Sequence, residues 1–463
     1  MAERPVVMIH GWSATSEGLE PLARLVRAQL GAEISIVRLA DYLSMEDEVR
    51  FDDLVSAMDR AWDAEGLPRT TGGVDALVHS TGGPVIRDWL DRNFAPGDSP
   101  VGRLVMLAPA NFGSPLAHKG RSLIARALKG FIAKKPEGRP FETGTQILKG
   151  LELASPYTWN LAGRDRFGEG GTRYQPGNVL CTVLVGNTGY RGIRSIANEE
   201  GSDGTVRVST ANMNCVRLTA SFPAHPEDPE VGHDVYWSKM EESTGSTAFG
   251  VLDGHNHGTI KLSHLRTRRL RSKRDRGALN DIIKSLTVQE DDFEQWREEL
   301  AVRNEALLPS TSRGNAQKHG FQNTVVRVED QYGVGVDDFL LEFYEKDDDR
   351  GRTAERFHRS AIRKVHKYRD DHSYRSVYID CTRLAAAIDK VGEYLSMSLT
   401  AYPELDPPKI PVGFETIADE HIGGLRIGKE DVNRFFAPHR TALVSLQLER
   451  QQSPEVFALR DYP

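Results

Sequence analysis

The stretch Asp75-Ala76-Leu77-Val78-His79-Ser80-Thr81-Gly82-Gly83 predicts a short buried strand that turns sharply into a helix, with a serine at the turn. Apolar residues precede the serine, and two glycines after it give the backbone room to reverse. An apolar helix face follows at Val85, Ile86, Trp89 and Leu90. This is the context of a nucleophile elbow, which presents a serine hydroxyl at the positive end of a helix. The peptide alone also fits an ordinary turn in which serine caps the helix.

The elbow departs from the usual G-x-S-x-G pattern, because Val78 stands where that pattern has its first glycine. The position is usually small, since the helix folds back against it, and a β-branched residue needs a wider approach. Val78 therefore puts the geometry of the turn in question rather than the type of chemistry.

Length and composition favour a soluble globular protein of two domains. A chain of 463 residues exceeds the size at which single cores stop growing. A net charge of -7 gives no overall attraction for nucleic acid, so none is expected as a partner. The three cysteines are odd in number and widely separated, which argues against a disulfide framework or a zinc site and favours a reducing compartment. They are Cys181, Cys215 and Cys381.

The start of the chain, Met1 to Arg4, leads directly into the apolar run Val6 to Ile9 and leaves no space for a signal peptide. No stretch approaches 18 continuous apolar residues. We therefore expect a cytoplasmic protein without a transmembrane segment. Peripheral membrane contact and secretion without a signal peptide remain open.

Five short apolar runs alternate with helical patterns, which predicts a mostly parallel sheet covered on both faces. The runs are 6–9, 34–37, 74–78, 104–107 and 179–185. The insertion at about 111–177 is too long for a plain crossover. Its residues Leu128 and Phe131 belong to an apolar helix face. That helix is either a cap packed on the sheet or a lid whose apolar face meets lipid.

A polar stretch from Pro309 to Gly320 indicates a domain boundary. From Thr324 onward apolar residues alternate with polar ones, which predicts a small β-sandwich with one helix near 384–391. We expect a catalytic domain at 1–305, a linker at 306–320 and a mainly-β accessory domain at 321–463, through which a protein partner could bind.

A serine nucleophile needs a base and an orienting carboxylate, and both have candidates downstream. Asp203 lies in a polar turn, Gly201 to Val206, where an aspartate is also a common turn former. His255 and His257 share one loop after an apolar run. In folds with a nucleophile elbow on a mostly parallel sheet, the serine, the acid and the histidine follow one another in this order along the chain.

The backbone N–H groups of Thr81 and of the Gly11-Trp12 loop are the candidate oxyanion donors, because one follows the nucleophile and the other leaves the neighbouring strand. Metal chemistry is a weaker interpretation of the paired histidines, since Asp253 is their only nearby acid. We therefore expect no metal and no cofactor.

Five motifs in order resemble lipases and esterases of the α/β-hydrolase superfamily, including the GPI-inositol-deacylase-like group. They are His10-Gly11-Trp12, Val78 to Gly83, Asn111-Phe112-Gly113-Ser114-Pro115, Gly201 to Gly204 and His257-Gly258-Thr259-Ile260. The resemblance covers Pro5 to Leu262. It implies an α/β-hydrolase fold with a helical cap, a Ser80, Asp203, His257 triad with His257 preferred over His255, no cofactor, and an acyl-lipid ester substrate. Phe112, Leu128 and Phe131 are then the candidate substrate-binding or lid residues.

These observations predict a serine carboxylic-ester hydrolase that acts through an acyl-enzyme. Two alternatives remain open: an acyltransferase that uses the same acyl-enzyme, and a non-catalytic binding module that keeps the elbow as scaffold.

The run Lys261 to Arg276 holds eight basic residues against one acid, a net charge of about +7. Arg268, Arg269 and Arg271 are therefore candidate contacts for anionic lipid headgroups. The alternative is a solvated helix face paired with the acidic cluster Glu290 to Glu294.

Overall fold

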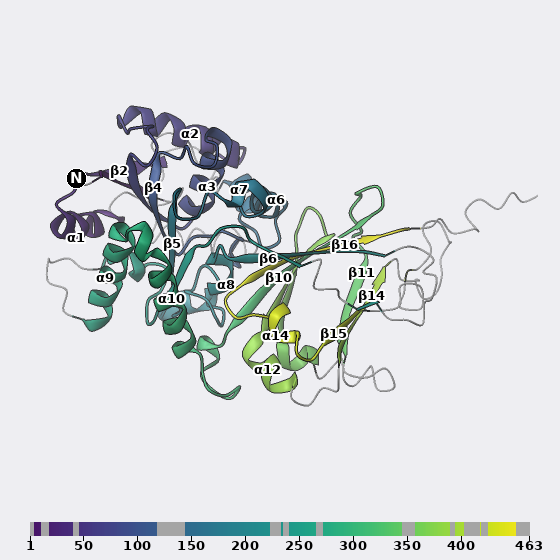
Figure 1. Cartoon of the computed structure of the whole chain (residues 1–463). Helices are drawn as coiled ribbons and strands as arrows, with labels where there is room; N and C mark the ends of the chain where they lie inside the picture. Colours follow the sequence, from purple (N-terminus) through teal and green to yellow (C-terminus); the bar gives the residue numbers. More distant parts are fainter. Residues whose placement is uncertain are drawn as a thin grey trace, which may run out of the picture. The chain divides into compact units, whose positions relative to one another are not determined.

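A computed structural model describes most of the chain in two compact units. The described residues are 4–10, 18–39, 46–117, 144–222, 233–234, 240–264, 272–344, 357–388, 394–401, 417 and 425–450. Chain contacts assign Met1–Cys215, Glu242–His319 and His439–Thr441 to the first unit, and Val216–Glu241, Gly320–Pro438 and Ala442–Pro463 to the second (Figure 1). Each unit is therefore built from segments that are separated in the sequence.

A six-stranded sheet with the order β2-β1-β3-β4-β5-β9 forms the centre of the first unit. All of its paired neighbours are parallel. Its strands are β1 (Val6–His10), β2 (Ile34–Arg38), β3 (Val74–His79), β4 (Val101–Leu107), β5 (Leu180–Gly186) and β9 (Ala248–Leu252). Every residue of β3 and β5 is buried, as expected for strands covered on both faces. The predicted parallel sheet is confirmed.

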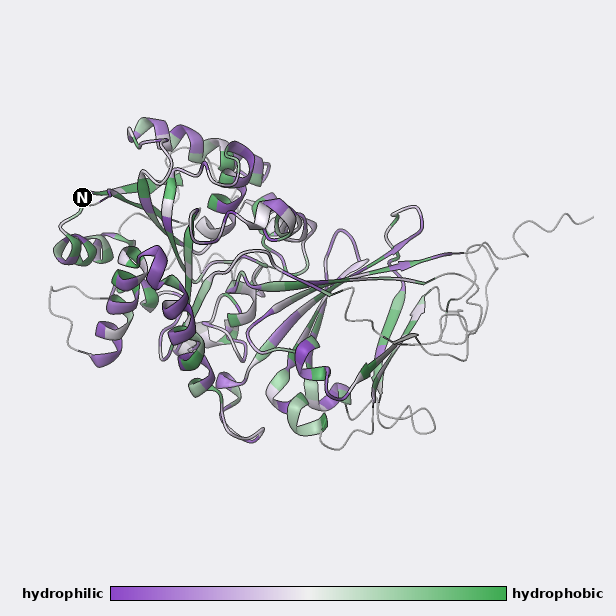
Figure 2. Cartoon of the chain, in the orientation of Figure 1, coloured by the Kyte–Doolittle hydropathy of each residue, from purple (hydrophilic) through white to green (hydrophobic). Residues whose placement is uncertain are grey.

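The longer helices of the first unit contribute buried apolar side chains to the core around this sheet, and Figure 2 shows hydrophobic residues among hydrophilic ones along these helices. They are α1 (Glu20–Leu30), α2 (Phe51–Ala64), α3 (Gly82–Asn93), α9 (Lys273–Thr287) and α10 (Glu290–Leu307). Shorter helices are α5 (Thr145–Gly150), α6 (Pro156–Asp165), α7 (Gly168–Gly171) and α8 (Val208–Ala211), with 3-10 turns η3 (Gly192–Ala197), η5 (Thr259–Lys261) and η6 (Ala316–Lys318). None of the described helices is long and apolar enough to span a bilayer.

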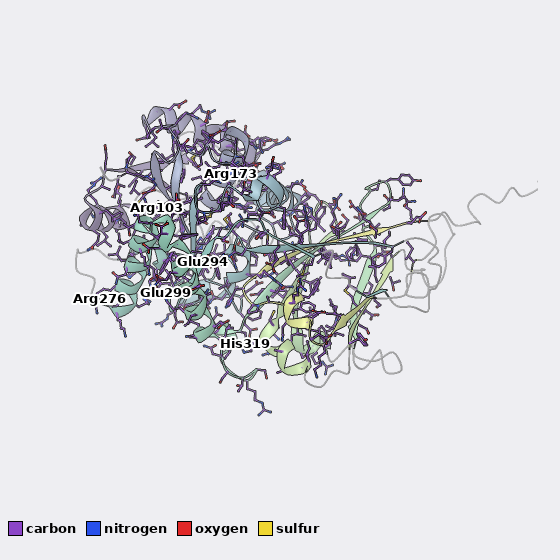
Figure 3. All side chains as sticks on the ribbon, in the orientation of Figure 1. Arg103, Arg173, Arg276, Glu294, Glu299 and His319 are labelled. Atoms are coloured by element: carbon purple, nitrogen blue, oxygen red, sulfur yellow. The ribbon has the colours of Figure 1, made fainter. Side chains whose placement is uncertain are left out.

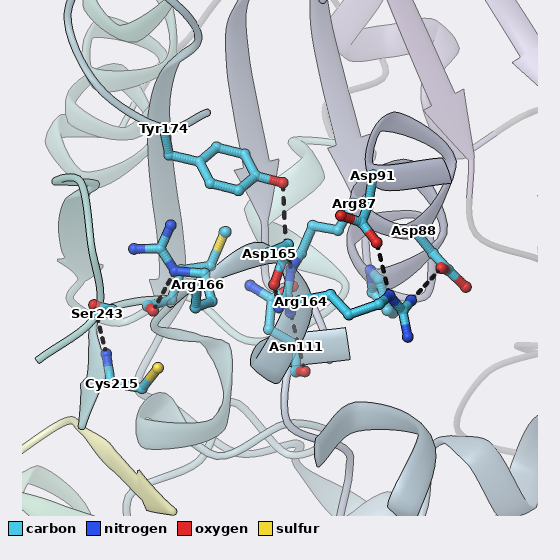
Figure 4. A network of polar contacts seen from close by, with 12 residues as sticks. Arg87, Asp88, Asp91, Asn111, Arg164, Asp165, Arg166, Tyr174, Cys215 and Ser243 are labelled. Carbon is cyan, nitrogen blue, oxygen red and sulfur yellow. Dashed lines mark hydrogen bonds and ion pairs between the residues drawn. The ribbon is translucent and has the colours of Figure 1, made fainter. Parts of the chain in front are cut away.

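A buried ion pair joins α3 to α6. Arg87 donates from Nε and Nη2 to the two carboxylate oxygens of Asp165, both at 2.7 Å, and neither side chain is exposed. Arg87 Nη1 also donates to the Asn111 carbonyl, and Tyr174 Oη donates to Asp165 (Figure 4). Removing one partner of such a pair costs about 3–5 kcal/mol, because the other charge stays buried. The pair thus fixes the helix after Ser80 relative to the loop after β4.

Arg103, labelled in Figure 3, joins the sheet to α9. Its Nη1 donates to Asp75 Oδ2 at 3.0 Å and its Nε donates to the Val288 carbonyl, at the C-terminal end of α9, at 2.7 Å. Burial raises the pKa of the Asp75 carboxyl, an effect that Arg103 opposes. The start of the elbow strand is therefore anchored at the end of the sheet opposite Ser80.

Two sheets make up the second unit. The order of the first is β12-β13-β10-β16-β6-β8, from β12 (Ile362–Lys367), β13 (Tyr374–Asp380), β10 (Phe321–Asp330), β16 (Thr441–Leu448), β6 (Cys215–Phe222) and β8 (Met240–Glu242). The order of the second is β11-β14-β15-β7, from β11 (Phe339–Tyr344), β14 (Tyr394–Ala401), β15 (Leu425–Gly428) and β7 (His233–Asp234). Both sheets contribute to one apolar core that includes Val328, Ile379, Phe343 and Leu399. The predicted mainly-β, sandwich-like architecture is confirmed.

The second unit also contains α12 (Cys381–Ile388) and the short α14 (Val432–Phe435). The helix expected near 384–391 is α12, which begins three residues earlier; 389–391 lie outside the described residues. Near the expected linker, the division between the units falls between His319 and Gly320. β6 belongs largely to the second unit, although it ends at Phe222, well before that linker begins at residue 306.

Candidate active site

Ser80 occupies the turn between β3 and α3 with a φ of 57°, in the left-handed region. Adopting this region costs a non-glycine residue about 1–2 kcal/mol, so the surrounding contacts must hold Ser80 in this conformation. Ser80 N–H donates to the Leu107 carbonyl at 3.1 Å, and the Ser80 carbonyl accepts from Gly83 N–H at 3.0 Å. The strand-to-helix turn predicted around Ser80 is therefore present, with its strained apex at the serine.

Gly82, on the helix side of the turn, lies next to the valine at position 78. A Cβ added at Gly82 would lie 3.4 Å from Val78 Cβ, in ordinary contact, so the helix passes the branched side chain without displacing it. A Cβ at Gly83 would lie 2.5 Å from Pro109 Cβ, which no real Cβ tolerates. Val78 itself keeps the sheet register, opposite Ile9 and Met106. Val78 in place of the first glycine of the G-x-S-x-G pattern therefore disturbs neither the sheet register nor the start of the helix.

His257 lies between Ser80 and Asp203. Its Nε2 is 3.0 Å from Ser80 Oγ and its Nδ1 is 2.8 Å from Asp203 Oδ2. A carboxylate only accepts, so Nδ1 carries the ring hydrogen and Nε2 accepts from the serine hydroxyl. All three side chains are buried. The structure thus brings together the serine, acid and histidine that were predicted to meet.

A tight turn holds the Asp203 carboxylate in place. Its Oδ1 accepts from the N–H groups of Thr205 at 2.9 Å and Val206 at 2.8 Å, which leaves Oδ2 for the histidine. Gly204 has a φ of 92°, and a Cβ there would lie 2.7 Å from the ring of Tyr190. The turn therefore requires glycine beside the acid, and it directs one carboxylate oxygen at His257.

His255, the second-choice base, lies elsewhere. Its Nε2 is 3.9 Å from Asp275 Oδ1, and burial lowers the pKa of its imidazole. Its carbonyl accepts from Thr188 N–H at 3.0 Å. The structure therefore places His255 between the loop after β5 and the first turn of α9, and His257 against the serine.

Of the other candidate site residues, Thr81 and Phe112 belong to the part of the chain that the structure describes. Thr81 is the N-cap of α3, so its N–H has no partner within the helix and is free to serve as an oxyanion donor. Phe112 is buried, with its ring centre 5.9 Å from the Arg87 guanidinium, and it does not line the cavity described below. Gly11, Trp12, Leu128, Phe131, Arg268, Arg269 and Arg271 lie outside the described residues.

The acidic cluster considered as a partner for the basic run lies at the start of α10. Within it Glu294, labelled with Glu299 in Figure 3, pairs with Arg297 of the same helix at 2.7 Å. Glu299 pairs with Arg303 and Lys284. In the ranges that the structure describes, no group of three or more His, Cys, Asp and Glu could hold a metal ion.

A small cavity with largely apolar walls opens beside Ser80. The described residues that line it are Ser80, Thr81, Ala110, Ser114, Leu116, Ala117, Leu148, Leu151, Thr205 and Val206. Sequence reasoning identified neither Leu148 nor Leu151, which belong to α5 and the turn after it within the 111–177 insertion. Their only sequence signal is their place in that insertion.

The whole chain is similar in structure to phospholipase PlaB from Legionella pneumophila. The TM-score is 0.74 and the identity 23%, over 99% of this chain and 97% of that chain. The first unit has the α/β-hydrolase fold. PlaB in complex with thio-NAD gives the same values. The likeness extends through the second unit, and at this identity it shows the α/β-hydrolase fold with its mainly-β addition rather than the reaction.

A lipase, BlEst2 from Bacillus licheniformis, matches with a TM-score of 0.35 and 15% identity, over 57% of this chain and 89% of that chain. A TM-score this low does not establish a common fold. No family model and no curated protein matches the sequence. The expected α/β-hydrolase fold is nevertheless confirmed by the sheet order and by the likeness to PlaB.

Proposed function

We propose that the protein is a serine carboxylic-ester hydrolase of the lipase or phospholipase type. The observation that carries the proposal is the position of His257, which accepts from Ser80 Oγ and donates to Asp203 Oδ2. A serine hydroxyl is a weak nucleophile unless a base removes its proton as it attacks. The hydrogen-bonded order serine, histidine, carboxylate supplies that base in the required tautomer.

In the proposed reaction Ser80 Oγ attacks the acyl carbonyl carbon while His257 Nε2 takes its proton. Asp203 stabilises the imidazolium that forms. His257 returns the proton to the departing alcohol oxygen, which leaves an acyl ester on Ser80. Water, deprotonated by His257, then attacks this ester and releases the carboxylic acid and the free serine. The Thr81 N–H contributes to binding of the oxyanion in both steps.

Two observations support a lipid ester as the substrate. The cavity beside Ser80 has apolar walls at Leu116, Leu148, Leu151 and Val206, which suits an acyl chain. PlaB, which shares the fold over 97% of its own chain, is called a phospholipase. We therefore propose an acyl-lipid substrate, with phospholipid as the first to be tested.

Two assays test the proposal. A fluorophosphonate probe should label the wild-type protein and leave Ser80→Ala unlabelled. Fatty acid release from phosphatidylcholine and phosphatidylglycerol vesicles, followed by mass spectrometry, should depend on the same serine. Labelling that persists in a folded Ser80→Ala variant would contradict the proposal. Added glycerol distinguishes hydrolysis from acyl transfer, because transfer would yield an acylglycerol in place of the free acid.

A further inference from the structure

His79, the residue before Ser80, contacts the main chain of His257. Its ring nitrogen Nε2 is 3.1 Å from the His257 carbonyl oxygen. A carbonyl oxygen only accepts, so Nε2 carries a hydrogen and donates it. The two imidazole rings also lie close, with centres 4.7 Å apart and planes at 49°. His79 is buried at the end of β3, with 4% of its surface exposed.

Two neighbouring residues of the elbow therefore hold opposite ends of His257. Ser80 donates to the tip of its ring, and His79 donates to its backbone carbonyl. Asp203 holds the same residue in a matching way, because its carboxylate accepts from the ring and its carbonyl accepts from His257 N–H at 3.0 Å. Both polar groups of the His257 main chain are thus taken up by residues adjacent to, or part of, the predicted triad.

This arrangement matters because His257 lies on a loop rather than on a strand or helix. The loop follows β9, at the edge of the sheet, whereas Ser80 follows β3 near its centre. A base on a loop must be held within a fraction of an ångström of the nucleophile, and a misplacement of about 1 Å can reduce the rate about 10²-fold. A hydrogen bond from the elbow to the base's own backbone sets that distance directly.

We propose that His79 is a positioning residue, whose Nε2–H holds the His257 carbonyl so that the His257 ring meets Ser80 Oγ. The proposal rests on the function proposed above. His79 does not transfer the proton, because its Nε2–H is engaged by the carbonyl while His257 contacts the serine. The other interpretation is that His79 is a core histidine that contributes only to stability. The two interpretations predict different kinetics.

Two substitutions at position 79 distinguish a positioning role from a purely structural one. His79→Phe keeps a flat ring against His257 but removes the donor. His79→Gln carries an amide N–H at about the reach of Nε2 and so preserves it. Each protein is titrated to completion with a fluorophosphonate, and kcat and KM for a soluble p-nitrophenyl ester are expressed per titrated site. The thermal midpoint is measured in parallel.

We expect His79→Phe to lower kcat per site about 10–100-fold with KM within about twofold of wild type, and His79→Gln to retain most of the rate. Equal kcat per site in His79→Phe and wild type would overturn the inference, as would an equal loss in His79→Gln and His79→Phe. If His79→Phe does not fold, His79→Asn replaces it, since its amide is too short to reach the carbonyl. A wild-type protein without labelling or ester hydrolysis would instead overturn the proposed function itself.

Discussion

Ser114 Oγ donates a hydrogen bond of 2.5 Å to the carbonyl of Thr205, whose own N–H donates to the carboxylate of Asp203. The loop after β4 is thereby attached to the turn that holds the acid. Ser114 and Thr205 also line the cavity beside Ser80. One hydroxyl group thus connects the wall of this cavity to the orientation of the carboxylate.

Removing this hydroxyl in Ser114→Ala should lower kcat several-fold. A buried carbonyl left without its donor costs about 1–3 kcal/mol, and the acid turn can then relax away from His257. Ser99→Ala is a matched control, because that buried hydroxyl bonds to Val101 at the opposite end of β4. Urea denaturation and ester kinetics should show both variants destabilised but only Ser114→Ala slowed. If Ser114→Ala and Ser99→Ala have the same kcat, Ser114 does not contribute to the orientation of Asp203.

His257→Ala and His255→Ala should differ sharply. Loss of the base at position 257 should reduce kcat by about 10³-fold or more, whereas His255 is 3.9 Å from Asp275 and contributes to packing. Asp203→Asn should lose about 10⁴-fold by favouring the wrong tautomer. Steady-state hydrolysis of an activated ester measures all three. If His255→Ala folds but is inactive while His257→Ala remains active, the base is His255 and not His257.

Filling the cavity in Leu148→Trp should change selectivity among acyl chains. The larger ring occupies space that an acyl chain would enter, so kcat/KM for an octanoyl ester should fall about tenfold or more relative to an acetyl ester. The ratio of the two esters is its own control against general loss of activity. An unchanged ratio would place the acyl chain elsewhere.

His439 predicts an acid-sensitive first unit. Burial lowers the pKa of its imidazole to about 4, whereas the unfolded residue titrates near about 6.5. Below about pH 6.5 the unfolded state therefore takes up a proton that the folded state refuses, and stability is lost as the pH falls toward 4. At pH 5 this single group accounts for a loss of about 2 kcal/mol.

The matched variant is His439→Asn, since position 439 has a φ of 60° and asparagine tolerates that conformation. Its fall in unfolding free energy between pH 7.5 and pH 5 should be about 2 kcal/mol smaller than that of the wild type. Tryptophan fluorescence suits the measurement, because Trp62, Trp89 and Trp296 are fully buried in the first unit. Parallel pH profiles for the two proteins would refute the assignment.

Residue patterns predicted the parallel sheet, the turn at Ser80 and the side chains that meet there, because periodicity and turn chemistry are local properties. They could not choose between His255 and His257 by the same means, since the two differ by two positions in one loop. The cavity walls at Leu148 and Leu151 and the His79 contact arise from segments far apart in the chain. Such contacts, especially those to a backbone carbonyl, leave no periodic signal in either segment.

The mixed composition of the two units bears on how the protein is made. His439–Thr441 belong to the first unit, where Asn212 donates to the His439 carbonyl and Thr441 Oγ1 donates to the Ser209 carbonyl. A ribosome must therefore synthesise most of the second unit before the first can be completed, unlike chains whose N-terminal domain folds as soon as it emerges. Neither unit can be excised by a single cut, and a partly synthesised chain exposes a first unit that still lacks His439–Thr441.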